Sequence, residues 1–142
     1  MASAWLIRRF IDPQARFSFA AERAAVPHDA LPFDMFGVEF THHGDDCTFE
    51  TLCRRFRLRG AAVARVGELV HDIDLKDATF GAPEASTISA MIDGLQLTHA
   101  DDHALLEHGI AMFESLYRSF DRSTRLARPG AVARPKRRAK HR

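Results

Sequence analysis

Apolar residues recur at helical spacing over residues 49–120. The four stripes are Phe49, Leu52, Cys53 and Phe56; Val63, Val66, Val70 and Ile73; Ile88, Met91, Ile92 and Leu95; and Leu106, Ile110, Phe113, Tyr117 and Phe120. Spacings of three, four and seven residues place each stripe on one face of an α-helix. We therefore predict four helices, with Thr48 as N-cap of the first and Asp101 as N-cap of the fourth.

The pattern before residue 49 is different. Residues 4–11 and 38–42 are short runs rich in β-branched and aromatic residues, which predicts two strands. In the first strand Arg8 and Arg9 are neighbours, so their side chains are predicted to lie on opposite faces. Strands followed by helices favour an α+β fold, a small antiparallel or mixed sheet packed on about four helices.

The charge is distributed unevenly along the 142 residues. Residues 122–142 hold nine of the twenty Lys and Arg residues and none of the nineteen Asp and Glu residues, so this tail is +9 and residues 1–121 are −8. We predict one folded domain over 1–121 and a disordered basic tail over 122–142. No secretory or membrane-spanning segment is evident, and two cysteines fit a reducing compartment, so a cytoplasmic location is expected. The oligomeric state stays open.

Histidines and carboxylates occur at the edges of the predicted apolar faces. His71 and Asp74 are three residues apart in the second helix, and His103 and Glu107 are four apart in the fourth, so each pair can share one ligand. Residues 41–50 add imidazole, carboxylate and thiol groups between a strand and a helix. The predicted metal ligands are His43, Asp46, His71, Asp74, His103 and Glu107, which would suit Zn, Fe, Ni or Mn. The alternative is that these are ordinary charged residues at helix edges and in a turn.

Four segments resemble a known family. They are residues 5–13 (WLIRRFIDP), 40–52 (FTHHGDDCTFETL), 70–77 (VHDIDLKD) and 102–109 (DHALLEHG). Together they are similar to the C-terminal domain family of the chromate resistance protein ChrB, over about residues 4–120. This resemblance implies a role in chromate resistance, as the part of a regulator that senses or binds chromate.

Chromate is a tetrahedral dianion, and a site for it or another oxyanion needs positively charged donors. We expect Arg8 or Arg9 to contact the anion, with His43 nearby, rather than the arginines at 54–59. Two other functions stay open. One is a metal-dependent or thiol redox enzyme, with Cys47 activated at a helix N-terminus. The other is an accessory protein whose basic tail binds nucleic acid weakly and without sequence preference. No membrane partner is expected.

Overall fold

The computed structural model describes residues 1–35 and 37–127, and this part of the chain is helical. Its elements are α1 (Ala2–Leu6), the π-helical turn η1 (Ile7–Ile11), the 3-10 turn η2 (Arg23–Ala25), α2 (Thr48–Arg55), α3 (Ala61–Leu75), α4 (Ala85–Thr98) and α5 (Asp102–Ala127). Over the same residues β pairing is limited to two isolated bridges, Phe33 with Phe40 and His43 with Asp46. The predicted α+β fold is therefore wrong.

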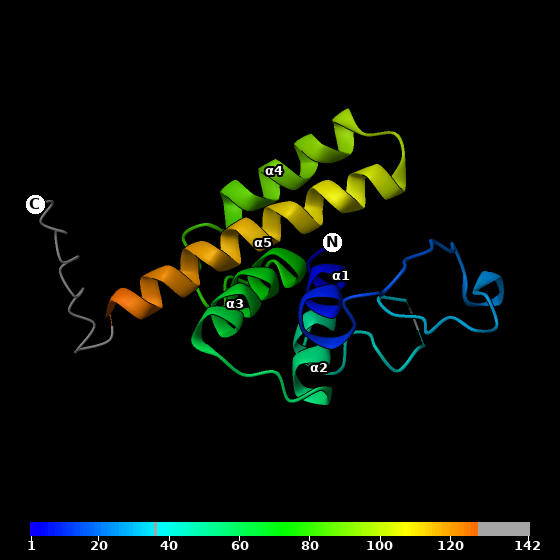
Figure 1. The fold of residues 1–142 in the computed structure, drawn as a ribbon, viewed down its shortest axis with the longest axis horizontal. Coiled ribbons are helices and arrows are strands. Elements are labelled where there is room, and N and C mark those ends of the chain that lie inside the picture. The colour runs from blue at the N-terminus through cyan, green and yellow to red at the C-terminus, as the bar shows by residue number, and fades with distance from the viewer. Residues whose placement is uncertain (36, 128–142) are drawn as a thin grey trace, which may run out of the picture.

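The helices pack around α5. α1 and α3 both lie against α5, α2 contacts α1 and α3, and α4 runs beside α5 as the other half of an antiparallel pair (Figure 1). The segment between η1 and α2 extends to one side of the helices as a long loop (Figure 1). This arrangement places the start of α2 beside the end of α3, where the candidate site lies.

Trp5 is the centre of the hydrophobic core. It is 1% exposed, its ring stacks on Phe49 and Phe113, and it also contacts Phe10 and Tyr117. The indole Nε1 donates a hydrogen bond to Glu114 Oε2 at 2.9 Å, so the one polar atom of this side chain is satisfied. Trp5 therefore joins α1, α2 and α5.

The segment predicted as a strand at 4–11 is instead the end of α1 followed by η1, and its first part, in α1, is buried on every side. All five residues of α1 are at most 8% exposed, and a helix without a polar face has no periodicity to tell it from a buried strand. The following turn is π-helical, with Asp12 N donating to Ile7 O at 2.8 Å. Residues 38–42 then have no neighbouring strand to pair with.

The four predicted helices are confirmed as α2–α5, with two changes at their ends. The N-cap of α2 is Cys47 rather than Thr48. The predicted cap at Asp101 is confirmed, because its carboxylate accepts a hydrogen bond from Ala104 N at 2.7 Å. α5 continues to Ala127, so residues 122–127 are helical, whereas the sequence predicts that they are disordered. Residues 128–142, with most of the predicted basic tail, lie outside the described residues.

Candidate functional site

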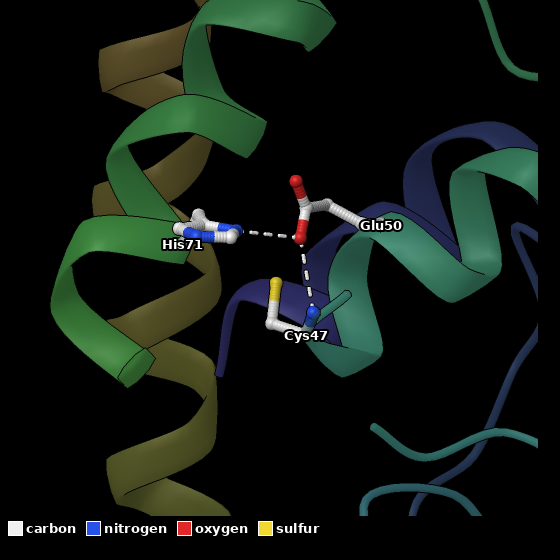
Figure 2. A group of neighbouring side chains, drawn as sticks. All are labelled: Cys47, Glu50 and His71. Carbon is white, nitrogen blue, oxygen red and sulfur yellow. Dashed lines mark hydrogen bonds and ion pairs between the residues drawn. The ribbon is translucent and has the colours of Figure 1, made fainter. Parts of the chain in front are cut away.

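Three side chains of metal-ligating type meet where α2 begins and α3 ends. They are Cys47, the N-cap of α2; Glu50, in the first turn of α2; and His71, in the last two turns of α3. Their ligand atoms all lie within 4.8 Å of one another, and in Figure 2 the thiol, the carboxylate and the imidazole point toward one space. Cys47 is 0% exposed and His71 is 5% exposed, whereas the Glu50 side chain is 20% exposed, so solvent reaches this group only at Glu50.

The capping of α2 brings Cys47 and Glu50 together. Glu50 Oε2 accepts a hydrogen bond from Cys47 N at 2.9 Å, and the backbone of Glu50 pairs with the Cys47 side chain, which is the reciprocal arrangement of a capping box. The same Glu50 oxygen accepts a hydrogen bond from His71 Nδ1 at 2.8 Å (Figure 2). One carboxylate oxygen therefore joins the first turn of α2 to α3.

The other side of the His71 ring faces the loop after α3. Its Nε2 lies 3.4 Å from Asp77 Oδ2, and its ring meets Phe80 edge to face at 4.9 Å between centroids. Asp72 holds this loop in place, because its two carboxylate oxygens accept hydrogen bonds from Phe80 N at 2.9 Å and Ala82 N at 2.8 Å. The imidazole is thus fixed between two carboxylates by a loop that is itself anchored.

Burial and neighbouring charges set the protonation of the group. Burial raises the pKa of the Cys47 thiol to about 12, which is opposite to the activation predicted for a cysteine at a helix N-terminus. Burial acts to lower the pKa of His71, but its contacts with Glu50 and Asp77 outweigh this and raise it. Without a bound ion, protons therefore occupy both the thiol and the imidazole more firmly than in an unfolded chain.

A second polar group lies beside the first. The buried Thr48 hydroxyl donates to Asp34 Oδ1 at 2.8 Å and lies 3.3 Å from His42 Nδ1. Burial and the charge of Asp34 raise the pKa of Asp74, while the neighbouring histidines His42 and His71 act in the opposite direction. The carboxylates of the long loop and of α3 therefore face the same region as the Cys47 group.

The six predicted metal ligands occupy several places. Of these, His71 belongs to the converging group. Asp74, predicted with it, lies in the neighbouring polar group near Asp34 and His42. The other four have separate partners: the His43 ring contacts Glu39 O at 2.6 Å, Asp46 pairs with Arg54, the His103 ring meets Phe19, and Glu107 pairs with Arg8.

Arg8 and Arg9 both face α5 rather than opposite sides of a strand. Arg8 Nη1 binds both carboxylate oxygens of Glu107, at 2.9 and 2.8 Å, and Arg9 Nε lies 3.6 Å from Glu114 Oε2. Both arginines lie in the helical turn η1, where neighbouring side chains do not alternate between two opposite faces as they would in a strand. Each guanidinium is thus already paired with a carboxylate, and an anion would have to compete with that carboxylate.

Cys47, Glu50 and Asp77 were not among the predicted ligands. Cys47 and Glu50 lie within the segment 41–50 that was recognised as a candidate, and the signal that distinguishes them is the spacing Cys-x-x-Glu, a capping box with cysteine in the place of serine or threonine. That spacing fixes both side chains at the start of a helix. Asp77 has no comparable signal, because its position depends on how the loop after α3 turns.

A cavity of about 610 Å³ lies between the long loop and α1, α2 and α5. Its walls are mostly apolar and include Phe17, Phe33, Phe40 and Leu52, whereas Cys47, Glu50 and His71 are not among the lining residues. The cavity and the converging group are therefore separate features. Over residues 1–35 and 37–127, no helix combines the length and apolar content that crossing a membrane requires.

Residues 1–120 match the family model described as "ChrB, C-terminal domain". A curated relative, Protein ChrB of Cupriavidus metallidurans (strain ATCC 43123 / DSM 2839 / NBRC 102507 / CH34), is 41% identical over 123 residues, which cover 84% of this chain and 37% of the relative. The chain thus corresponds to little more than a third of that protein's length. No solved structure matches the chain significantly. The match over nearly all of the described helices shows that the chain belongs to the ChrB C-terminal domain family.

Proposed function

We propose that this domain senses chromate as part of a chromate resistance response, and that it holds a divalent metal ion while doing so. The observation that carries the proposal is the family match over residues 1–120, supported by 41% identity to Protein ChrB. The match includes the converging group at the junction of α2 and α3, whose thiol, carboxylate and imidazole are ligands that transition metals accept.

A sensing role agrees better with the side-chain chemistry than a thiol redox enzyme does. The Cys47 thiol is fully buried with a pKa of about 12, and burial likewise raises the pKa of Cys53 to about 12. At neutral pH and without a bound ion both are therefore thiols, whereas nucleophilic or redox catalysis needs a free thiolate. A metal ion can still bind such a sulfur, because it displaces the proton when it binds. A buried polar group that joins two helices can instead change their packing when its ligand or charge changes.

Arg8 and Arg9 remain the proposed chromate contacts, now with the condition that the anion competes with Glu107 and Glu114. A charge-assisted hydrogen bond contributes about 1.5–3 kcal/mol, so loss of a contacting arginine corresponds to about 10–100-fold weaker binding. Replacing Glu107 with glutamine removes the competitor of Arg8 without removing the guanidinium, and is expected to strengthen chromate binding.

Isothermal titration calorimetry of the full chain with chromate, and separately with sulfate, tests the proposal. We expect chromate to bind more tightly than sulfate, Arg8→Ala or Arg9→Ala to weaken it, and Glu107→Gln to strengthen it. Arg125→Ala is the matched control, because Arg125 is also paired with a carboxylate of α5, Asp121, but at the far end of that helix. Absence of chromate binding would overturn the sensing proposal, and equal affinity in all variants would overturn the assignment of Arg8 and Arg9.

A further inference from the structure

We infer that Cys47 Sγ, Glu50 Oε2 and His71 Nδ1 are three ligands of a tetrahedral site for an ion of the zinc class, and that Asp77 positions the His71 ring. This inference deepens the proposed function, on which it rests for its biological role, by naming the ligand atoms and the class of ion. The site joins residues 21 positions apart in the sequence, Glu50 and His71, on two different helices.

The spacing of the donor atoms is close to that of a tetrahedral site. Bonds of about 2.0–2.3 Å around a tetrahedral ion place neighbouring ligand atoms about 3.3–3.8 Å apart. The three donor atoms already lie within 4.8 Å of one another, and Nδ1 and Oε2 are 2.8 Å apart because a proton joins them. Replacing the protons with an ion therefore requires these separations to change by at most about 1.5 Å.

The chemistry of the donors selects the ion. Thiolate and imidazole favour borderline ions such as Zn²⁺, and a carboxylate completes sets of this kind, whereas Mg²⁺ and Ca²⁺ prefer sites made of oxygen alone. With three protein ligands the fourth position of the tetrahedron is left for water or another small ligand.

Asp77 acts on the metal through His71. Because Nδ1 faces Glu50 and the thiol, it is the nitrogen that would bind the ion, and Nε2 is left to donate its proton to Asp77 Oδ2, 3.4 Å away. A carboxylate on the second ring nitrogen fixes the tautomer and orientation of a ligand histidine and makes it a better donor. Loss of such a partner usually weakens metal binding by about 10–100-fold.

Neither of the simpler roles of these residues uses the thiol in this way. The helix cap uses the Cys47 side chain only as an acceptor for the backbone of Glu50, a role in which serine is the commoner residue. The ion pair needs only Glu50 and His71. A readout that depends on a bond between sulfur and the ion therefore separates the metal site from a purely structural group.

The experiment is a titration of the chelator-treated full chain with Co²⁺, followed by the sulfur-to-cobalt charge-transfer absorption, and then with Zn²⁺ as competitor. We expect the wild-type chain to develop this absorption at one equivalent and to lose it on addition of Zn²⁺. Cys47→Ser is expected to abolish it, whereas Cys53→Ser, a change of the other thiol on the same helix, is expected to preserve it. Serine at the N-cap is a good helix cap, and circular dichroism checks that both variants are folded.

Asp77→Asn is expected to weaken Co²⁺ binding by about 10–100-fold with the charge-transfer absorption still present at saturation, and Asp77→Glu to restore part of the affinity. No charge-transfer absorption in the wild-type chain, or an unchanged absorption in Cys47→Ser, would overturn the metal site. Unchanged affinity in Asp77→Asn would overturn the positioning role. Since no chromate is present, failure here is distinct from failure of the calorimetric test with chromate.

Discussion

The hydrogen bond between Trp5 and Glu114 is expected to be one of the stronger polar interactions of the fold. It joins a 1% exposed indole N–H to a carboxylate whose side chain is 25% exposed, at 2.9 Å, and it links α1 to α5. Hydrogen bonds to charged groups contribute about 1.5–3 kcal/mol, and a buried donor left without a partner costs about 1–3 kcal/mol. We therefore expect Glu114→Ala to lower the free energy of unfolding by about 2–3 kcal/mol.

A double-mutant cycle with Trp5→Phe isolates this contact from the loss of indole volume. Urea unfolding followed by circular dichroism measures the four free energies of unfolding, because Trp5→Phe removes the one tryptophan that fluorescence would follow. The expected coupling energy is about 1.5–3 kcal/mol. Glu107→Gln is the matched control on the same helix; Glu107 is 61% exposed at its side chain, and its pair with Arg8 is expected to contribute at most about 1 kcal/mol.

The pH dependence of Glu114→Gln supplies a second check. Burial acts to raise the pKa of Glu114, but the Trp5 hydrogen bond and the guanidinium groups of Arg118 and Arg9 outweigh it and hold the pKa below the ordinary 4.5. The resulting stabilisation is fully present above the ordinary pKa and is lost as pH falls through the lower folded value. The difference between wild type and Glu114→Gln should therefore shrink as pH falls below about 4.5. A coupling energy near zero, or a difference independent of pH, would refute the reasoning.

Three further variants test other parts of the structure by chemical denaturation. Asp72→Asn removes the charge that accepts two backbone N–H groups of the loop after α3, and is expected to cost about 2–3 kcal/mol and to speed hydrogen exchange of that loop. Gly94→Ala, where an added Cβ meets nothing within 4 Å inside α4, is expected to stabilise by about 0.5–1 kcal/mol. Gly109→Ala is expected to destabilise despite the same gain in helix propensity, because its Cβ would lie 2.5 Å from Met1 Sδ and 3.0 Å from Met1 Cβ. An equal effect of the two alanines would contradict the packing described at α5.

Local periodicity was sufficient to predict α2–α5, since each has one buried face and one exposed face. It was insufficient for α1, because Trp5 and its neighbours are buried on all sides and show no alternation with polar residues. The α+β prediction rested on two predicted strands, at 4–11 and 38–42. Because the first of these is helical, residues 38–42 have no second strand with which to form a sheet.

The candidate site was predicted in part for a similar reason. Helical phase placed His71 and Asp74 toward the interior, and both face the start of α2. The phase of one helix does not say which residues of a neighbouring segment it meets. The sequence therefore predicts His43 and Asp46 as partners of His71, whereas the structure shows Cys47 and Glu50 in that position. Cys47 and Glu50 come together because residue 47, and not the predicted residue 48, is the N-cap of α2 and forms a capping box with Glu50.

The position of Trp5 also has a consequence for how the chain reaches its native state. Its partner Glu114 is 109 residues further along, and α1 rests on α5. Contacts between such distant segments raise the contact order, so folding is expected to be slower than in helical proteins built from neighbouring hairpins. During synthesis α2, α3 and α4 emerge while the indole still lacks most of its final surroundings. The core therefore closes only when α5 arrives, and until then an exposed α1 is a natural site for a chaperone to bind.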